Sequence, residues 1–194
     1  SAARNAGLEI AKGEYITFVD ADDEIYPHSL KNLLTYATEN NLDLLYPKIT
    51  YIDAAGKVTG EFLMDSDKEE ILDGFQHQRR GFIFAFYKKI LLSTIRFNPK
   101  IPIAEDSLFN IEVHTIAKRC GYKNWNYYKY RREIISSSSS TFPQTERAFV
   151  GFIEQLWCIR RLIDKNRRVF TQEQIAYFDR PYYITIEMMT KVNI

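Results

Sequence analysis

The spacing of hydrophobic residues near the start of the chain predicts helices alternating with strands. Residues 2–12 are rich in Ala, Leu, Glu and Lys, which favours a helix, and Gly13 stands where a left-handed C-terminal cap is expected. Residues 15–19 (YITFV) form an unbroken β-branched and aromatic run, typical of a strand buried on both faces of a parallel sheet. A second helix is predicted to open at Pro27. One face of that helix carries its apolar residues, Leu30, Leu33, Leu34 and Ala37.

The middle of the chain predicts further strands and two helices. Residues 43–52 read as a strand, which Pro47 places near an edge or a bulge, and residues 58–64 are expected to pair back onto it. The polar segment 65–80 is interpreted as a short helix. A helix is also predicted over Ser107–Arg119, with Leu108, Ile111 and Ile116 inward, and the aromatic run 122–130 is expected to be extended.

The last third of the chain reads as helical. The five serines 136–140 cannot pack a core, so they predict a loop and a candidate lid. A helix is expected over 145–166, and another begins at Thr171, where Gln174 completes a capping box. The predicted fold class is therefore α/β with a helical C-terminal tail, divided into 1–142 and a helical extension over 143–194.

Composition narrows the possible roles. The 194 residues are 45% hydrophobic and 26% charged, which excludes a disordered or low-complexity chain. The net charge of +1 predicts no nucleic-acid partner. Two cysteines and the absence of an apolar run of about 20 residues favour a cytoplasmic protein. Because the chain lacks an initiating Met and opens inside a predicted helix, we expect it to be a fragment.

Basic residues gather at the end of the 145–168 helix, which also carries aromatic residues. Such a helix either rests on an anionic membrane, which would place the protein at the inner face of the cell membrane, or packs on the α/β core. The residues favour packing, and peripheral membrane contact stays open.

Three acidic residues, Asp20, Asp22 and Asp23, follow directly on the predicted strand 15–19. Ligands of open α/β sheets bind beyond the carboxyl ends of strands, and clustered carboxylates suit Mg²⁺ or Mn²⁺. The alternative is that these residues cap the following helix. A phosphohydrolase with Asp20 as nucleophile is a further alternative, which Glu24 disfavours.

Glu105 and Asp106 precede the helix predicted over Ser107–Arg119. An acidic residue at a helix start caps free N–H groups and complements the helix dipole. An ionised aspartate is also a general base that can accept a proton from an attacking hydroxyl. Both interpretations stay open on the sequence.

Three segments together resemble the core of family 2 glycosyltransferases of the GT-A fold. These are ARNAG at 3–7, AKGEYI at 11–16 and FVDADD at 18–23, which Pro27 and Leu30 follow as the family pattern expects. Arg96-Phe97, then Glu105-Asp106, resembles the family's later segment. The resemblance spans about residues 1–140 and implies a Rossmann-like mixed sheet flanked by helices, incomplete at its N-terminus.

The resemblance implies roles residue by residue. Asp22 binds Mn²⁺ or Mg²⁺, and Asp20 either contacts the nucleotide or helps to bind the metal. Arg4 and Glu105 lie at the nucleotide-sugar, and Asp106 is the catalytic base. The implied reaction moves one sugar, with inversion, from a nucleotide-diphospho-sugar to a hydroxyl of a carbohydrate or lipid-linked acceptor.

Two departures from the family pattern bear on this chain. The family's first strands, which hold the nucleotide base and ribose, are absent, so we expect this chain alone to bind donor weakly and to be inactive. The QxxRW motif of processive synthases is also absent, which favours single-sugar transfer.

A non-catalytic remnant that binds a partner remains an alternative. The aromatic residues 125–130 either form a sugar-stacking wall or pack in the core, and the core is favoured.

Overall fold

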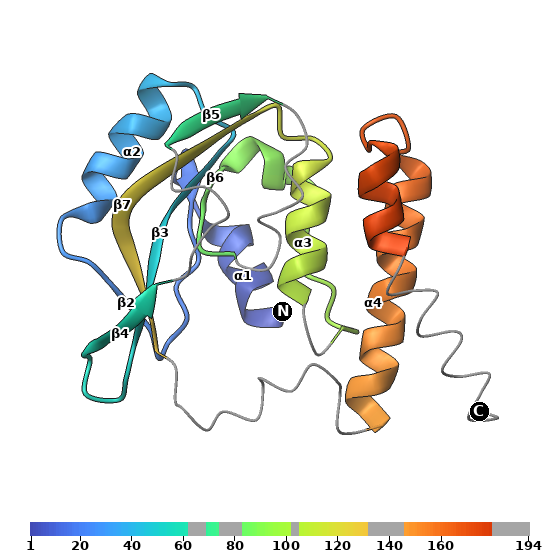
Figure 1. The fold of residues 1–194 in the computed structure, drawn as a ribbon, viewed down its shortest axis with the longest axis horizontal. Helices are drawn as coiled ribbons and strands as arrows, with labels where there is room; N and C mark the ends of the chain where they lie inside the picture. The colour runs from blue at the N-terminus through green and yellow to red at the C-terminus, as the bar shows by residue number, and fades with distance from the viewer. Residues whose placement is uncertain (62–68, 74–82, 102–104, 132–145, 180–194) are drawn as a thin grey trace.

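The computed structural model describes residues 1–61, 69–73, 83–101, 105–131 and 146–179, of which 73 and 146–149 are described as backbone only. Seven strands form one mixed sheet in the order β1-β6-β3-β7-β2, with β4 paired to β3 and β5 to β7 (Figure 1). The strands are β1 (Tyr15–Ile16), β2 (Glu24–Ile25), β3 (Leu44–Ile52), β4 (Val58–Glu61), β5 (Glu70–Asp73), β6 (Phe86–Lys88) and β7 (Arg119–Arg131).

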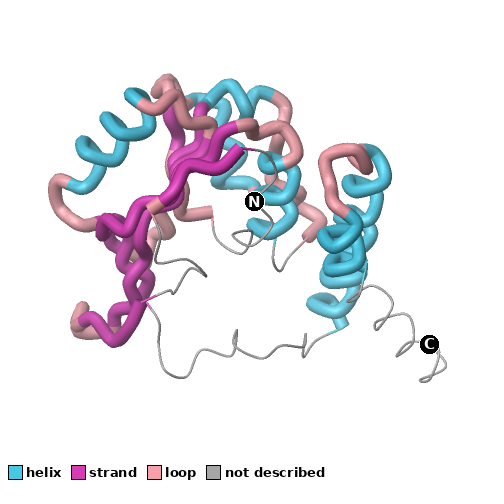
Figure 2. The backbone as a smooth tube through the Cα atoms, turned by 45° about the horizontal axis from the view of Figure 1, so that its top comes forward, coloured by secondary structure: helices cyan, strands magenta, loops and turns pink. Residues whose placement is uncertain are grey.

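The helices flank this sheet and extend beyond it. They are α1 (Ala2–Ile10), α2 (Ser29–Glu39), the 3₁₀ turn η2 (Lys89–Ser93), α3 (Glu105–His114), α4 (Glu146–Lys165) and a helix over 172–179. Helix α2 packs on β3 and β7, and α3 packs on α4. Figure 2 shows α4 beyond α3, on the side away from the strands. No helix among the described residues is long and apolar enough to cross a membrane.

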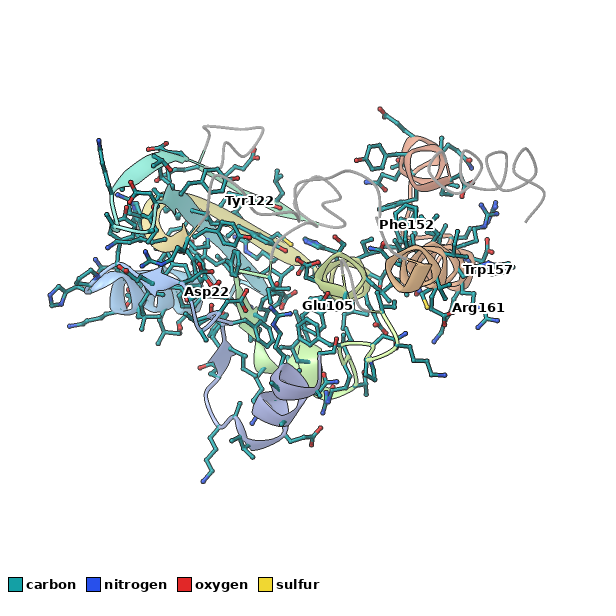
Figure 3. All side chains as sticks on the ribbon, turned by 90° about the horizontal axis from the view of Figure 1, so that it is seen from below. Asp22, Glu105, Tyr122, Phe152, Trp157 and Arg161 are labelled. Atoms are coloured by element: carbon teal, nitrogen blue, oxygen red, sulfur yellow. The ribbon has the colours of Figure 1, made fainter. Side chains whose placement is uncertain are left out.

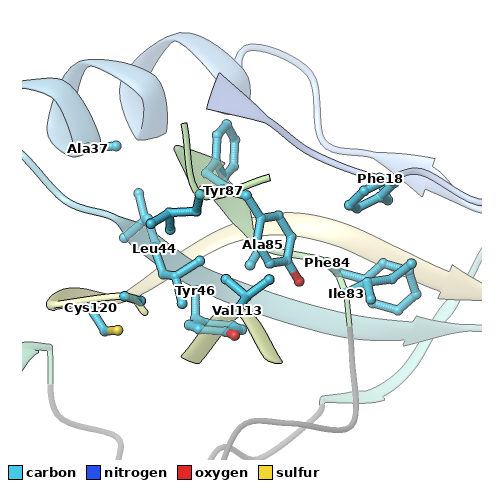
Figure 4. Close-up of a cluster of buried hydrophobic side chains, with 14 of the residues drawn as sticks. Phe18, Ala37, Leu44, Tyr46, Ile83, Phe84, Ala85, Tyr87, Val113 and Cys120 are labelled. Carbon is cyan, nitrogen blue, oxygen red and sulfur yellow. The ribbon is translucent and has the colours of Figure 1, made fainter. Parts of the chain in front are cut away.

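The sheet is held by one long parallel pair. Strands β3 and β7 are paired in parallel from Leu44 and Cys120 to Ile52 and Arg131, whereas the other pairings in the described sheet are antiparallel. Side chains of both strands join those of β6, α2, α3 and η2 in the main core, part of which Figure 4 shows around Leu44, Tyr87 and Val113. Burial of this many aliphatic and aromatic side chains is the main force that stabilises the fold.

A second hydrophobic cluster joins α3 to the helical tail. Leu108 and Ile111 of α3 contact Ile159 and Ile163 of α4, and Phe170 and Phe178 close the cluster. The predicted packing of the 145–166 helix on the α/β part is therefore correct for this face. The predicted capping box is also confirmed, because Thr171 and Gln174 exchange backbone-to-side-chain hydrogen bonds of 2.8 and 3.2 Å.

Three predictions for the first elements are wrong. The strand predicted over 15–19 is paired only at Tyr15–Ile16, antiparallel to β6, and Val19 is 47% exposed because no strand of the described sheet covers it. Helix α1 ends at Ile10, and Ala11 rather than Gly13 caps it, in an extended conformation. Of the four apolar residues predicted for one face of α2, Leu33 and Ala37 are buried, whereas Leu30 and Leu34 are exposed at the edge of that face.

The later segments show two further differences. Residues 70–73, predicted as helix, form strand β5 because β7 offers them an antiparallel partner. Helix α3 ends at His114, and Ile116, expected inward, lies exposed in the turn that leads into β7. Pro47 lies on a central strand, where its pairing with β7 is interrupted by a bulge as predicted. The serine run 136–140 lies outside the described residues.

Candidate functional site

Arg4 joins three segments that are distant in sequence. It lies on α1, and its two terminal nitrogens donate to Asp20 Oδ1 at 2.7 Å and to Glu105 Oε1 at 2.8 Å. All three side chains are partly buried, which strengthens such ion pairs relative to fully exposed ones. The guanidinium also lies over the ring of Phe97, 5.4 Å from its centroid. The structure thus brings together Arg4, Asp20 and Glu105, three of the residues to which the family resemblance assigns nucleotide-sugar binding.

The neighbouring Asn5 fixes the position of α1. Its side-chain amide donates to the backbone oxygen of Phe97 at 2.8 Å and accepts from the backbone N–H of Phe97 at 2.9 Å. The Asn5 side chain thus forms the same pair of hydrogen bonds with the Phe97 backbone as a neighbouring strand would. These bonds position Arg4, the preceding residue, over the aromatic ring of Phe97. Phe97 stacks on Phe109 at 4.0 Å, and Phe18 meets both rings edge-on.

The end of β7 holds the acidic loop between β1 and β2. The Tyr128 hydroxyl accepts from the backbone N–H of Asp20 at 2.9 Å and donates to Asp23 Oδ2 at 2.7 Å. The backbone N–H of Arg131 donates to Asp23 Oδ1 at 2.7 Å, and its guanidinium donates to the backbone oxygen of Asp22 at 3.0 Å. Strand β7, the longest strand of the described sheet, therefore holds the loop at both of its ends, Asp20 and Asp23.

Because of these bonds the three carboxylates of the loop have different surroundings. Asp20 is engaged by Arg4, and Asp23 is tied into the sheet by Tyr128 and Arg131. Burial raises the pKa of Asp23, against the hydrogen bonds from Arg131 and Tyr128, which lower it. The side chain of Asp22 is exposed and makes no hydrogen bond or ion pair within the described part of the chain. Asp22 is the carboxylate of this loop that remains available to a ligand.

The carboxylates of the acidic loop fit a hard divalent cation only if other ligands complete its coordination. Within the described ranges, no group of three His, Cys, Asp or Glu side chains is arranged to hold a metal ion. Mg²⁺ and Mn²⁺ are, however, commonly held by one or two carboxylates while phosphate oxygens and water complete the octahedron. The available carboxylate of Asp22, with Asp20 two residues earlier, matches that smaller donor set. Figure 3 labels Asp22 and Glu105, which mark the loop and the start of α3.

Asp106 lies in the first turn of α3, beside Glu105. Burial raises the pKa of Asp106 to about 6, and the charge of Glu105 acts in the same direction. The backbone N–H of Ser107, 2.7 Å from Asp106 Oδ1, and the charge of Arg4 lower it. Asp106 is thus a largely buried carboxylate, and its raised pKa lies nearer to neutrality than that of an ordinary aspartate. Its place in the helix also fits the capping interpretation, because the Ser107 bond satisfies a free N–H of the first turn.

The structure shows whether the aromatic residues of 125–130 pack in the core or form a surface on which a sugar could stack. Tyr127 and Tyr128 are fully buried, Tyr127 bonds to Thr17 at 2.8 Å, and only Trp125 is exposed at the surface. The run is therefore mainly core, as favoured on the sequence. Sequence reasoning missed Asn5 and Tyr128 as site residues; the Arg-Asn pair at 4–5 was a signal for the first, but no local signal identified the target of the Tyr128 hydroxyl.

Comparison with known proteins gives a consistent family. A family model described as glycosyl transferase family 2 matches residues 1–98, just over half of the chain. TarP of Staphylococcus aureus, a poly(ribitol-phosphate) beta-N-acetylglucosaminyltransferase, is 29% identical over 163 residues, which cover 81% of this chain and 50% of TarP. A poly(ribitol-phosphate) beta-glucosyltransferase of Bacillus spizizenii is 30% identical, over 97% of this chain and 31% of that protein. The chain spans half or less of the length of these two relatives.

Solved structures share the fold. Residues 1–349 of TarS from S. aureus in complex with UDP superpose with a TM-score of 0.64 at 22% identity, covering 84% of this chain and 44% of that chain. The same part of TarS in complex with UDP-GlcNAc gives a TM-score of 0.61. This likeness confirms the expected GT-A fold.

Proposed function

This chain belongs to glycosyl transferase family 2, and on that premise we propose that it carries the catalytic part of an enzyme that transfers a single sugar from a nucleotide-diphospho-sugar to an acceptor hydroxyl. One observation carries the proposal: Arg4 holds Asp20 of the acidic loop and Glu105 of α3 in one ion-pair network, beside Asp106. TarS binds UDP and UDP-GlcNAc, so a uridine diphosphate sugar is the donor proposed for this chain.

Asp106 is proposed as the base that activates the acceptor. The carboxylate takes the proton of the acceptor hydroxyl as that oxygen attacks the anomeric carbon. A new glycosidic C–O bond forms while the bond between the anomeric carbon and the diphosphate oxygen breaks, and the nucleoside diphosphate leaves. Because attack and departure occur on opposite faces of the sugar, the anomeric configuration inverts. The raised pKa makes Asp106 a stronger base than an ordinary aspartate.

Asp22, with Asp20, is proposed to hold Mn²⁺ or Mg²⁺ when donor binds. A cation there would stabilise the negative charge that develops on the departing diphosphate. Tyr128 binds the backbone N–H of Asp20 and Arg131 binds the backbone oxygen of Asp22, so the backbone that carries the exposed Asp22 carboxylate is held at the site. Arg4 has a second role, because it compensates the charge of Asp20 and Glu105 before any ligand arrives.

The acceptor is proposed to be a hydroxyl-bearing carbohydrate or polyol polymer. TarP and the B. spizizenii relative are both named for transfer to poly(ribitol-phosphate), which supports a polymer of that class. A lipid-linked carbohydrate offers the same hydroxyl chemistry.

The test compares Asp22→Asn with Glu39→Gln in the longest natural chain that contains residues 1–194. Glu39 is an exposed carboxylate at the end of α2, so the control removes one negative charge away from the loop. Sugar transfer from UDP-GlcNAc and calorimetric binding of Mn²⁺ with UDP are both measured. We expect transfer that requires Mn²⁺ or Mg²⁺, loss of metal affinity in Asp22→Asn, and no change in Glu39→Gln. Transfer that persists with a chelator would reject the metal role, and failure with every nucleotide-sugar would reject the transferase.

A further inference from the structure

The face of α4 that does not pack on α3 carries large apolar residues. Ile159 and Ile163 are buried against α3, whereas Val150 is 59% and Trp157 is 50% exposed. Val150 and Trp157 are seven residues apart, so they lie on one side of the helix, two turns from each other. Figure 3 shows Trp157 and Arg161 together on the side of α4 away from the sheet. We call this side the outer face of α4.

The outer face continues into a group of basic residues. Arg161 and Lys165 follow Trp157 at four and eight positions, and Arg168 is exposed in the turn after the helix. Neither Arg161 nor Lys165 makes an ion pair within the described part of the chain, whereas Arg160 is paired with Asp179 and Asp164. The exposed carboxylates Glu154 and Asp164 lie on the same side of the helix, and Asp164 is paired with Arg160 and Arg167. Arg161, Lys165 and Arg168 therefore leave an excess of positive charge at the basic end of the outer face.

A pocket opens beside these two basic residues. It lies between α3 and α4, has a volume of about 290 Å³, and is lined by both Arg161 and Lys165. Leu108 and Leu162 contribute apolar walls. Glu112 contributes a carboxylate whose pKa is raised by burial and lowered by the nearby charge of Lys165. The fourth charged group is Arg96, which is already bound to Glu9. An anionic headgroup would find its counter-charges at Arg161 and Lys165.

We propose that the outer face of α4 docks on a membrane surface that contains anionic lipid, with Trp157 at the interface and Arg161, Lys165 and Arg168 against headgroup phosphates. Tryptophan prefers the boundary between headgroups and acyl chains, and basic residues near it are attracted by the negative surface. The charge excess favours a lipid surface over a second copy of the chain, which would place the same basic groups against each other. The inference rests on α4 alone and does not require the proposed transferase activity.

Vesicle sedimentation with the 194-residue chain tests this docking. Vesicles of phosphatidylcholine alone are compared with vesicles that also contain phosphatidylglycerol. Binding is expected only to the second kind, and it should weaken as salt is added. With Trp125→Phe, Trp157 is the only tryptophan left in the chain, and its fluorescence should shift to shorter wavelength on binding.

Two double variants provide the matched comparison. Arg161→Gln with Lys165→Gln should weaken binding about 30-fold, since each basic side chain near an anionic surface contributes roughly a fivefold factor. Lys31→Gln with Lys57→Gln removes the same charge from exposed sites outside α4 and should leave binding unchanged. The proposal is overturned by equal binding to both kinds of vesicle, by no binding, or by equal loss in both double variants. A dimer in gel filtration that Arg161→Gln with Lys165→Gln dissolves would overturn it in favour of a second copy.

Discussion

Replacing Asp106 by Asn should make the fold more stable at neutral pH. The ordinary pKa of this carboxyl is 3.8, and burial raises it to about 6 in the folded chain. At roughly 1.36 kcal/mol for each pKa unit, ionised Asp106 costs the folded state about 3 kcal/mol. Asn keeps the acceptor oxygen that binds the Ser107 N–H, but it carries no charge to desolvate.

The sign of the effect follows from the raised pKa. The stability contributed by protonated Asp106 is complete below about pH 3.8 and is lost as the pH rises through about 6. The variant should therefore match the wild type near pH 4 and exceed it by up to about 3 kcal/mol above pH 6.5.

Urea unfolding of the 194-residue chain at several pH values measures this difference. Glu39→Gln is the control, because a charge change on an exposed side chain should alter the free energy of unfolding by less than about 0.5 kcal/mol. If Asp106→Asn is no more stable than the wild type near pH 7.5, or if its gain is the same at every pH, Asp106 is not a desolvated carboxylate.

Two further substitutions test the supports of the site. Tyr128→Phe should lower the free energy of unfolding by about 1–3 kcal/mol, because the Asp20 N–H and Asp23 Oδ2 both lose their hydrogen-bond partner. Circular dichroism during urea unfolding measures this loss, and an unchanged midpoint would contradict the prediction. Asn5→Ala should lower the free energy of unfolding by about 1–3 kcal/mol and weaken nucleotide binding, since α1 loses both hydrogen bonds to Phe97. Calorimetry with UDP measures the binding, and a normal affinity would show that Asn5 does not position Arg4.

Periodicity predicted elements well where the signal is local. The pairing of β4 with β3 and the capping box at Thr171 both depend on neighbouring residues, and the structure confirms them. The prediction of a strand over residues 15–19, buried on both faces, was wrong for a different reason. A hydrophobic run indicates burial only if a partner strand lies on each side, and the sequence does not say which strands pair. Residues 70–73 became strand β5 because of such a partner.

The site was predictable in part. The acidic triplet and the Glu-Asp pair were recognisable as candidate chemistry, and the network around Arg4 brings the two segments together. The different surroundings of the three aspartates were not predictable, because they depend on Tyr128 and Arg131 more than a hundred residues later. A tyrosine in an aromatic run gives no sign of where its hydroxyl will bond.

The rate of sugar transfer by Asp106→Asn most directly tests whether Asp106 faces the same site as the acidic loop. In the longest natural chain that contains residues 1–194, the variant should bind UDP with Mn²⁺ about as tightly as the wild type, while transfer from UDP-GlcNAc falls by about 10²- to 10⁴-fold. A variant that transfers sugar at the full rate would contradict the assignment of Asp106 as the base.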